Sequence, residues 1–288
     1  MNKKYNELIE EVLSTSDFMS KEIRHHIKLN IKKYNHFNYQ KIQYILNFME
    51  NIYDTKFKGY LIIFPTDFKK ELNEQDTIPP TKLGNNITTH NINGGITIKY
   101  QNPNHKPIIC IWRKEELERT LIHELIHYYN SDLLKTKKVN KFVKSLNFNI
   151  NYLGNAEELM TELLTFFHCL KIRKSSDKEL RQEISHSFLN SVKILKHTGH
   201  PTFSSFFVRN PKTQIKTDTS LIYYYILKGF VLFFLDPKNI PNKINVSYDD
   251  FLLRELKKIT SPKYVKIIDD IMLGFKFDYD RSLRHMFY

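Results

Sequence analysis

The sequence predicts an α+β protein that is mostly helical, with a small β-sheet that precedes one central helix. Three observations predict this class. Apolar residues recur at three- and four-residue spacing over most of the chain. Short β-branched and aromatic runs occur mainly between residues 59 and 112. Directly after them, His123-Glu124-Leu125-Ile126-His127 forms an HExxH motif within a helical pattern.

Composition indicates a globular protein with a basic surface. The chain has 288 residues, of which 41% are apolar, so it can bury a substantial core. Lys and Arg outnumber Asp and Glu by 44 to 31, which gives a net charge of +13. Such an excess could attract nucleic acid, but no basic cluster is long or patterned, so a Lys-rich soluble surface is the simpler interpretation.

The same composition predicts a cytoplasmic protein that does not enter a membrane. The N-terminal residues contain no apolar stretch of the signal-peptide type. The longest apolar run, from Leu221 to Leu235, is too short and too interrupted for a membrane span. Cys110 and Cys169 are the only cysteines, too few for a disulfide framework, so we expect a reducing compartment.

The first 112 residues are predicted to contain helices and then the sheet. Residues 3–53 show helical spacing, and Gly59–Pro65 is a short apolar run that ends at a proline, as in a buried strand. Residues 66–85 are polar and predict a loop. We expect a hairpin at 87–100, because Asn93-Gly94 suits the positive φ angles of a tight turn, and a further strand at 107–112.

The pattern is helical from Lys114 almost to the end. The motif helix should cover 114–130, with Lys114-Glu115-Glu116 as a charged first turn. The remaining helices are expected at 133–147, 156–173, 177–197, 217–235, 248–259 and 262–273. Because no composition shift marks a boundary, we expect one domain over 1–288, with two lobes (about 1–130 and about 131–288) and a cleft at the motif helix.

The HExxH spacing predicts a metal site. Residues four apart project from one face of a helix, so His123 and His127 can offer two ring nitrogens to one ion. Glu124 lies beside them, where it can handle the proton of a metal-bound water. A catalytic zinc requires a third protein ligand and an open position for that water.

Two glutamates on a following helix are the candidates for the third ligand. Glu158 and Glu162 are four residues apart and share one helix face. One could bind the metal while the other accepts the N–H of a ligating histidine. A different interpretation needs no metal, because Asn155 and Glu158 could form a helix N-cap and its capping-box partner.

These two helices resemble those of the gluzincins, the thermolysin-like superfamily of zinc metallopeptidases. In that family HExxH is followed by an E-x-x-S-D segment, which Glu158-Leu159-Met160-Thr161-Glu162 matches with two conservative changes. The family has Asn before the ligand, whereas this chain has Glu157. The resemblance, over about 60 residues, implies a zincin-like fold, one catalytic Zn²⁺ held by His123, His127 and Glu158, and Glu162 as the partner of a motif histidine. A similarity to the clostridial neurotoxin light chains instead implies Glu162 as the ligand.

The resemblance also implies a function, namely hydrolysis of peptide bonds in a protein or peptide substrate. Glu124 would activate the zinc-bound water, and a Tyr or His of the helical half would stabilise the oxyanion. We name Tyr224 for that role, among the candidates Tyr223, Tyr224, Tyr225, His197 and His200. Zincins also pair an edge strand with extended substrate, a role open here to 107–112 or 96–100.

An alternative function is not enzymatic. The charge of +13 is compatible with a basic module that binds nucleic acid or a protein partner and that has a degenerate zincin fold. Metal content distinguishes the two functions, because only the peptidase requires a bound zinc.

Overall fold

The computed structural model of the chain describes residues 3–14, 21–30, 40–70, 87, 93–100, 102, 104–130, 136–236 and 248–275. Within these residues the protein is mostly helical with one three-stranded sheet, which confirms the predicted α+β class. In chain order the elements are α1 (Lys3–Ser14), α2 (Lys21–Asn30), α3 (Gln40–Tyr53), β1 (Tyr60–Thr66), β2 (Gly95–Ile98), β3 (Ile108–Arg113), α5 (Leu117–Asn130), α6 (Lys137–Ser145), α7 (Glu157–Arg173), α8 (Asp177–His197), η3 (Ser204–Phe207), η4 (Ile222–Leu227), α9 (Lys228–Phe234), α10 (Tyr248–Ile259) and α11 (Pro262–Gly274).

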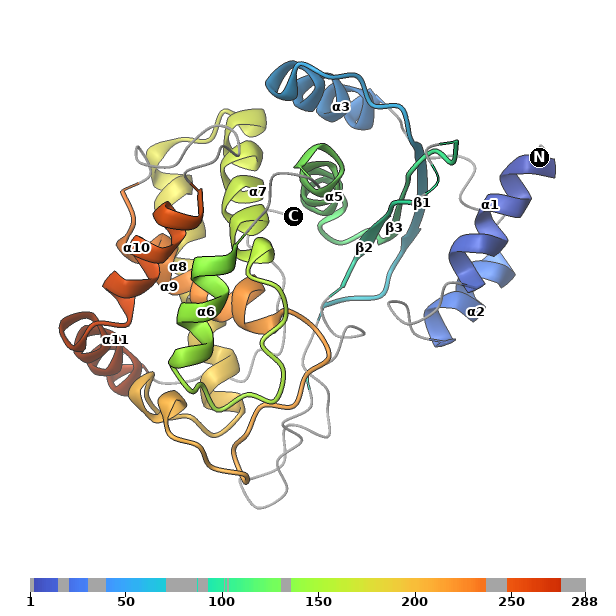
Figure 1. The fold of residues 1–288 in the computed structure, drawn as a ribbon. Helices are drawn as coiled ribbons and strands as arrows, with labels where there is room; N and C mark the ends of the chain where they lie inside the picture. The colour runs from blue at the N-terminus through green and yellow to red at the C-terminus, as the bar shows by residue number, and fades with distance from the viewer. Residues whose placement is uncertain are drawn as a thin grey trace.

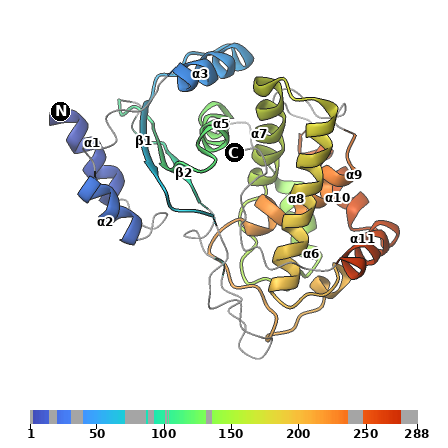
Figure 2. The ribbon, with the colours of Figure 1, turned by 180° about the vertical axis from the view of Figure 1, so that it is seen from behind.

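The sheet separates two layers of helix. Its strand order is β1-β3-β2, with β1 parallel and β2 antiparallel to the central β3. Successive side chains of a strand point to opposite faces. Accordingly, Ile108 and Trp112 of β3 pack in a cluster with α1 and α2, whereas Ile109 and Ile111 belong to the larger cluster that contains α5. Figures 1 and 2 show α1 and α2 on one side of the sheet and α5 on the other.

The tight turn predicted at Asn93-Gly94 of the 87–100 hairpin is wrong. Residues 88–92 lie outside the described residues, but Gly94 has no positive φ and therefore does not form the expected turn. Its carbonyl instead accepts a hydrogen bond from Trp112 N–H at 2.9 Å, so this stretch extends the ladder between β2 and β3. Because β3 occupies the centre of the sheet, the 107–112 strand has no open edge for a substrate, and among the described strands β2 lies at the edge.

The second half is a group of helices packed against α5 through α7. Helix α7 contacts α5, and α8 contacts α9 and η4 (Figure 1). The helices expected at 177–197 and 248–259 are confirmed at those bounds. The segment expected as one helix at 217–235 begins at Leu221, and residues 222–227 form a π-helix, a rare form that often accompanies functional sites. The division into two lobes stays a prediction.

The start of the motif helix also differs from expectation. Helix α5 begins at Leu117, so Lys114-Glu115-Glu116 is not its first turn. Glu116 has a positive φ of 59° and a fully buried carboxylate, which contacts the Lys70 ammonium at 2.8 Å. The prediction that these residues form the charged first turn is wrong, because Glu116 makes a buried ion pair before the helix begins.

No helix within the described ranges combines the length and the apolar character that crossing a membrane requires.

Gly229 provides a test of the packing between α8 and α9. A Cβ atom there would lie 2.0 Å from Ser191 Oγ and 2.4 Å from the Ser187 carbonyl oxygen, so α8 would have to move. We expect Gly229→Ala to lower the free energy of unfolding by about 1–3 kcal/mol, the usual cost of overpacking. At Gly274 nothing lies within 4 Å of such a Cβ. Gly274→Ala is therefore the matched control and should cost nothing, and equal losses in urea unfolding would contradict this packing.

His168 provides a pH test of the contact between α3 and α7. Its ring packs edge-on against Phe48, is 1% exposed, and lacks a hydrogen-bond partner among the described residues. Burial lowers the pKa of His168 to about 4 from 6.5. The unfolded chain therefore binds the proton more tightly, and stability present above pH 6.5 is lost as the pH falls toward 4.

Urea unfolding of metal-free protein at pH 7 and pH 5 measures this loss. His168→Phe should lose about 2 kcal/mol less than the wild type over that interval. Burial also lowers the pKa of His200 to about 4. His200 therefore adds to the loss of stability at low pH, and the His168→Phe variant keeps that part of the loss. The exposed His105 is the matched position, and His105→Phe should behave as the wild type does. Equal losses in the His168→Phe protein and the wild type would refute the assignment.

Candidate metal centre

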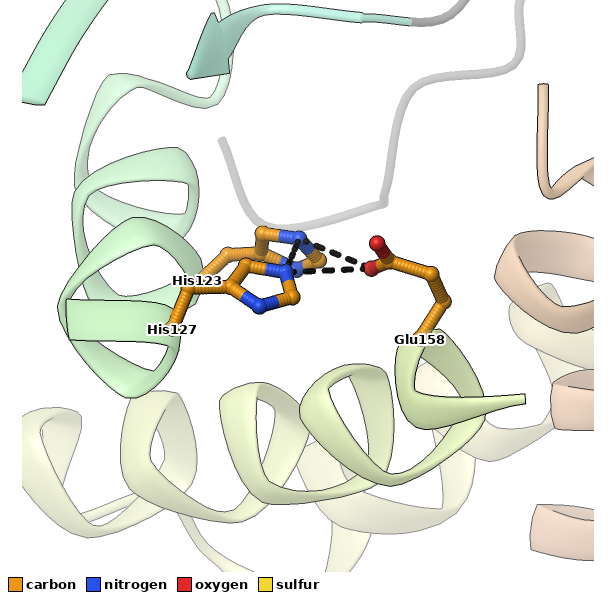
Figure 3. Close-up of side chains that lie close together, drawn as sticks. All are labelled: His123, His127 and Glu158. Atoms are coloured by element: carbon orange, nitrogen blue, oxygen red, sulfur yellow. Dashed lines mark hydrogen bonds and ion pairs between the residues drawn. The ribbon is translucent and has the colours of Figure 1, made fainter. Parts of the chain in front are cut away.

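Three side chains from α5 and α7 converge on one point. His123 and His127 lie one turn apart on α5, and Glu158 lies in the first turn of α7 (Figure 3). The two Nε2 atoms are 3.1 Å apart, and Glu158 Oε2 is 3.1 Å from His127 Nε2 and 3.4 Å from His123 Nε2. Within the described part of the chain, this is the one cluster of three or more His, Cys, Asp or Glu side chains whose ligand atoms could hold a metal ion.

These separations suit zinc. Ligands about 2.0–2.1 Å from a tetrahedral ion lie about 3.3 Å from one another. The three observed distances, 3.1, 3.1 and 3.4 Å, are close to that triangle. Two imidazoles and a carboxylate are also the donor set of many catalytic zinc sites, which leave one position open. The chemistry and spacing of His123, His127 and Glu158 therefore fit a zinc ion.

Glu162 has a different position from Glu158. Its Oε1 lies 2.9 Å from His123 Nδ1, the ring nitrogen that faces away from the cluster. This contact is an ion pair without the geometry of a hydrogen bond. Glu162 Oε2 contacts Arg119 of α5 and, at 3.1 Å, Lys228 of α9. Glu162 therefore orients a candidate ligand and does not join the cluster. Of the two roles left open for this residue, the geometry favours the partner of a motif histidine.

Neighbouring charges together outweigh burial in setting the pKa values of His123, Glu158 and Glu162. Burial lowers the pKa of His123, but the carboxylates of Glu158 and Glu162 outweigh it and raise that pKa to about 9. Burial raises the pKa of Glu158, but His127 and His123 bring it down to about 2. The pKa of Glu162 also lies well below its usual value, because Arg119 and Lys228 outweigh its burial. Without a metal the cluster therefore stabilises a positive charge between its carboxylates, as a cation site should.

Glu124 faces the same cleft from α5 and is held by the sheet. The Thr97 hydroxyl of β2 lies 2.8 Å from Glu124 Oε2 and 2.9 Å from the Glu124 carbonyl oxygen, and its single proton can serve one of them at a time. Burial raises the pKa of Glu124, while the nearby His123 and His127 oppose that rise. A buried carboxylate of raised pKa beside a metal position is suited to general base and acid chemistry.

Tyr224 is the predicted oxyanion residue that the structure brings to the cluster. It lies in the π-helix η4, half-buried, with its ring centre 5.8 Å from that of His123. Burial and the carboxylates of Glu158 and Glu124 raise the pKa of Tyr224 well above 10, so its hydroxyl is a proton donor at neutral pH.

The other four oxyanion candidates lie elsewhere. Tyr223 is a core residue, 1% exposed, and His200 is buried with partners in Asn149 and Thr198. His197 lies at the end of α8 and lines neither the groove nor the recess at the cluster. Tyr225 lines only the recess beside the cluster, whereas Tyr224 lines both the recess and the open groove.

The cluster opens into a groove beside the edge strand. Ile96, Thr97 and Lys99 line one wall, and Glu157, Glu158 and Tyr224 line the other. The Lys99 ammonium donates to the carbonyls of His127 and Tyr128, and so ties the end of β2 to α5. An edge strand beside a ligand cluster can offer main-chain hydrogen bonds to an extended chain.

The capping box suggested for Asn155 and Glu158 is not formed. Asn155 Oδ1 does accept the Glu157 N–H at 3.2 Å, but the Glu158 carboxylate contacts the two histidines instead. A complete capping box occurs at Ser176 and Glu179, which begin α8. The S-x-x-E spacing at that position would have predicted it.

Sequence reasoning missed three residues that hold the site together. Arg119 lies four residues before His123, so the helical repeat places both on one face and could have indicated it. Lys228 interrupts an otherwise apolar run, and such a pattern indicates a buried charge that has a partner of opposite charge. Nothing in the sequence pairs Thr97 with Glu124, which is 27 residues away.

Glu162 provides a test of the histidine's support. Glu162→Gln keeps the size of the side chain but removes the charge beside His123 Nδ1, so we expect zinc affinity to fall about 10–100-fold. Glu157→Gln is the matched control on the same helix, because that carboxylate is outside the cluster, and it should leave zinc affinity unchanged. Competition with a chromogenic chelator measures both. An unchanged affinity in a folded Glu162→Gln protein would exclude the orienting role.

No protein-family model matches the chain, and no curated protein and no solved structure matches it either.

Proposed function

We propose that this protein is a zinc-dependent metallopeptidase of zincin-like fold. In this proposal His123, His127 and Glu158 hold one catalytic Zn²⁺, Glu124 acts as general base, and the substrate is a protein or peptide. The observation that carries the proposal is the convergence of two imidazole nitrogens and one carboxylate oxygen within 3.1–3.4 Å, with Glu124 next to one of those histidines on the same helix.

The arrangement of the elements around the cluster supports the same proposal. A three-stranded sheet precedes α5, its antiparallel edge strand β2 contacts α5, and α7 supplies the third ligand from the opposite side. The groove between β2 and α7 leaves the cluster open to an extended chain. The basic alternative predicts no such convergence of ligand atoms, so the peptidase is the better-supported function.

In the proposed reaction each residue has one task. Zinc, when bound, polarises the scissile carbonyl and acidifies water at neutral pH. Glu124 takes a proton from the attacking water and delivers it to the leaving nitrogen as the C–N bond breaks. Thr97 holds that carboxylate in the cleft, and Tyr224 donates its hydroxyl proton in a hydrogen bond to the developing oxyanion. Glu162 keeps His123 oriented throughout.

Separating metal binding from proton transfer tests the proposal. Glu124→Gln removes the base but none of the three ligands, so it should retain about one zinc per chain and lose cleavage by at least about 100-fold. His127→Ala should lose both. Zinc is measured by plasma emission after gel filtration, and cleavage by mass spectrometry of a complex peptide mixture.

Two outcomes of this experiment would contradict the proposal. Wild-type protein that stays zinc-free after supplementation and filtration would remove the metal site. Cleavage that persists in Glu124→Gln at the wild-type rate would assign the proton transfer to another residue or to a contaminant. Tyr224→Phe, measured alongside, should keep zinc and lower kcat more than it changes KM.

A further inference from the structure

A small recess opens from the groove at the metal cluster and continues toward the beginning of α5. Groove and recess share His123, Glu124 and Tyr224, so a chain lying in the groove passes the mouth of the recess. The recess is lined further in by Lys70, Arg119 and Thr120, which do not line the groove. It therefore lies where a side chain beside the scissile bond would point.

Glycines at the entrance to β2 keep one wall of the recess bare. A Cβ at Gly94 would lie 3.3 Å from Thr120 Oγ1, and a Cβ at Gly95 would lie 2.7 Å from Thr120 Cγ2. The cavity volume is about 40 Å³, which is room for about three water molecules. A carboxylate or carboxamide fits such a space, whereas an aromatic ring does not.

The inner lining presents hydrogen-bond donors. The Thr120 hydroxyl is buried, belongs to a side chain that is 5% exposed, and has no partner among the described residues. Lys70 and Arg119 add two buried cations, 6% and 5% exposed. A buried hydroxyl without a partner is destabilising, so a ligand that supplies an acceptor relieves that cost.

Two of these donors already have a carboxylate partner, because Arg119 pairs with Glu162 and Lys70 pairs with Glu116 at 2.8 Å. The Lys70 ammonium carries three N–H groups, so it can donate to a ligand while it keeps Glu116. Glu162 is engaged by Arg119, Lys228 and His123, and Glu124 is engaged by Thr97. Hydrogen bonds between a cation and a carboxylate are roughly twice as strong as those between neutral groups. The chemistry of the inner wall therefore matches an anionic acceptor of small size.

We propose that this recess is a specificity pocket for a short acidic side chain, aspartate above all, next to the scissile bond. The inference rests on the proposed function, since it needs a substrate in the groove. Lys70 and Thr120 are its specificity-determining residues. Lys70 supplies charge, so it discriminates Asp from the isosteric Asn, and Thr120 supplies the neutral donor at the inner wall.

Cleavage-site profiling of a proteome-derived peptide mixture tests the pocket. With zinc-loaded wild-type protein, Asp should be enriched about tenfold over Asn at one position flanking the cut bond, as a charge-assisted hydrogen bond predicts. Lys70→Met should remove the preference of Asp over Asn. Thr120→Val, which is nearly isosteric, should reduce the enrichment of both residues over Ala.

Lys69→Met is the matched control, because Lys69 is the exposed neighbour of Lys70 and does not line the recess. It removes the same charge from the same loop and should keep the wild-type profile. Since Lys70→Met leaves the Glu116 carboxylate buried without its partner, the double variant Lys70→Met/Glu116→Gln is profiled as well. It should lose the Asp preference in the same way, with folding checked by thermal unfolding.

The outcomes separate the two proposals. Cleavage with no acidic preference at either flanking position, or an Asp preference that survives both Lys70 variants and Thr120→Val, overturns the pocket alone. Absence of any cleavage by the zinc-loaded wild type overturns the proposed function, and the pocket as a substrate site with it.

Discussion

The buried carboxylate of Glu162 is the interaction on which the arrangement of the site depends. It joins α7 to α5 through Arg119 and His123, and to α9 through Lys228, and all four side chains are nearly excluded from solvent. Removing one partner from such a group leaves an uncompensated charge, at a cost of about 3–5 kcal/mol. The helices must therefore keep one mutual position, and that position is the one in which the ring of His123 faces Glu158.

The cleft follows from this fixed pair of helices and from the sheet. Helix α5 lies between the sheet and α7 (Figure 1), so one of its sides carries the ligands while the other packs on β2 and β3. Thr97 and Lys99 tie the edge strand to α5 through the Glu124 carboxylate and the carbonyls at the end of the helix. These contacts set the positions of the proposed metal ligands, the base Glu124 and the edge strand β2 relative to one another.

The sequence predicted the parts of the site that local spacing determines. The HExxH histidines share a helix face because they are four residues apart, and the α+β order follows from where the period of the apolar pattern changes. Spacing alone left Glu158 and Glu162 open, because both lie on one face of α7, and the preference for Glu158 came from the gluzincin resemblance. The contacts that separate the two glutamates involve Arg119 and Lys228, which come from other helices. The turn predicted at Asn93-Gly94 was wrong because pairing with β3, a contact remote in sequence, overrode the local turn signal. The π-helix that presents Tyr224 has no signature in the spacing of its residues.

Zinc-edge anomalous diffraction from crystals grown with one equivalent of Zn²⁺ tests the central claim most directly. The account predicts one strong peak per chain, with His123 Nε2, His127 Nε2 and a Glu158 carboxylate oxygen each about 2.0–2.2 Å from it and Glu162 outside that distance. A peak bound by Glu162 in place of Glu158, or a zinc ion held elsewhere on the chain with the cluster empty, would contradict it.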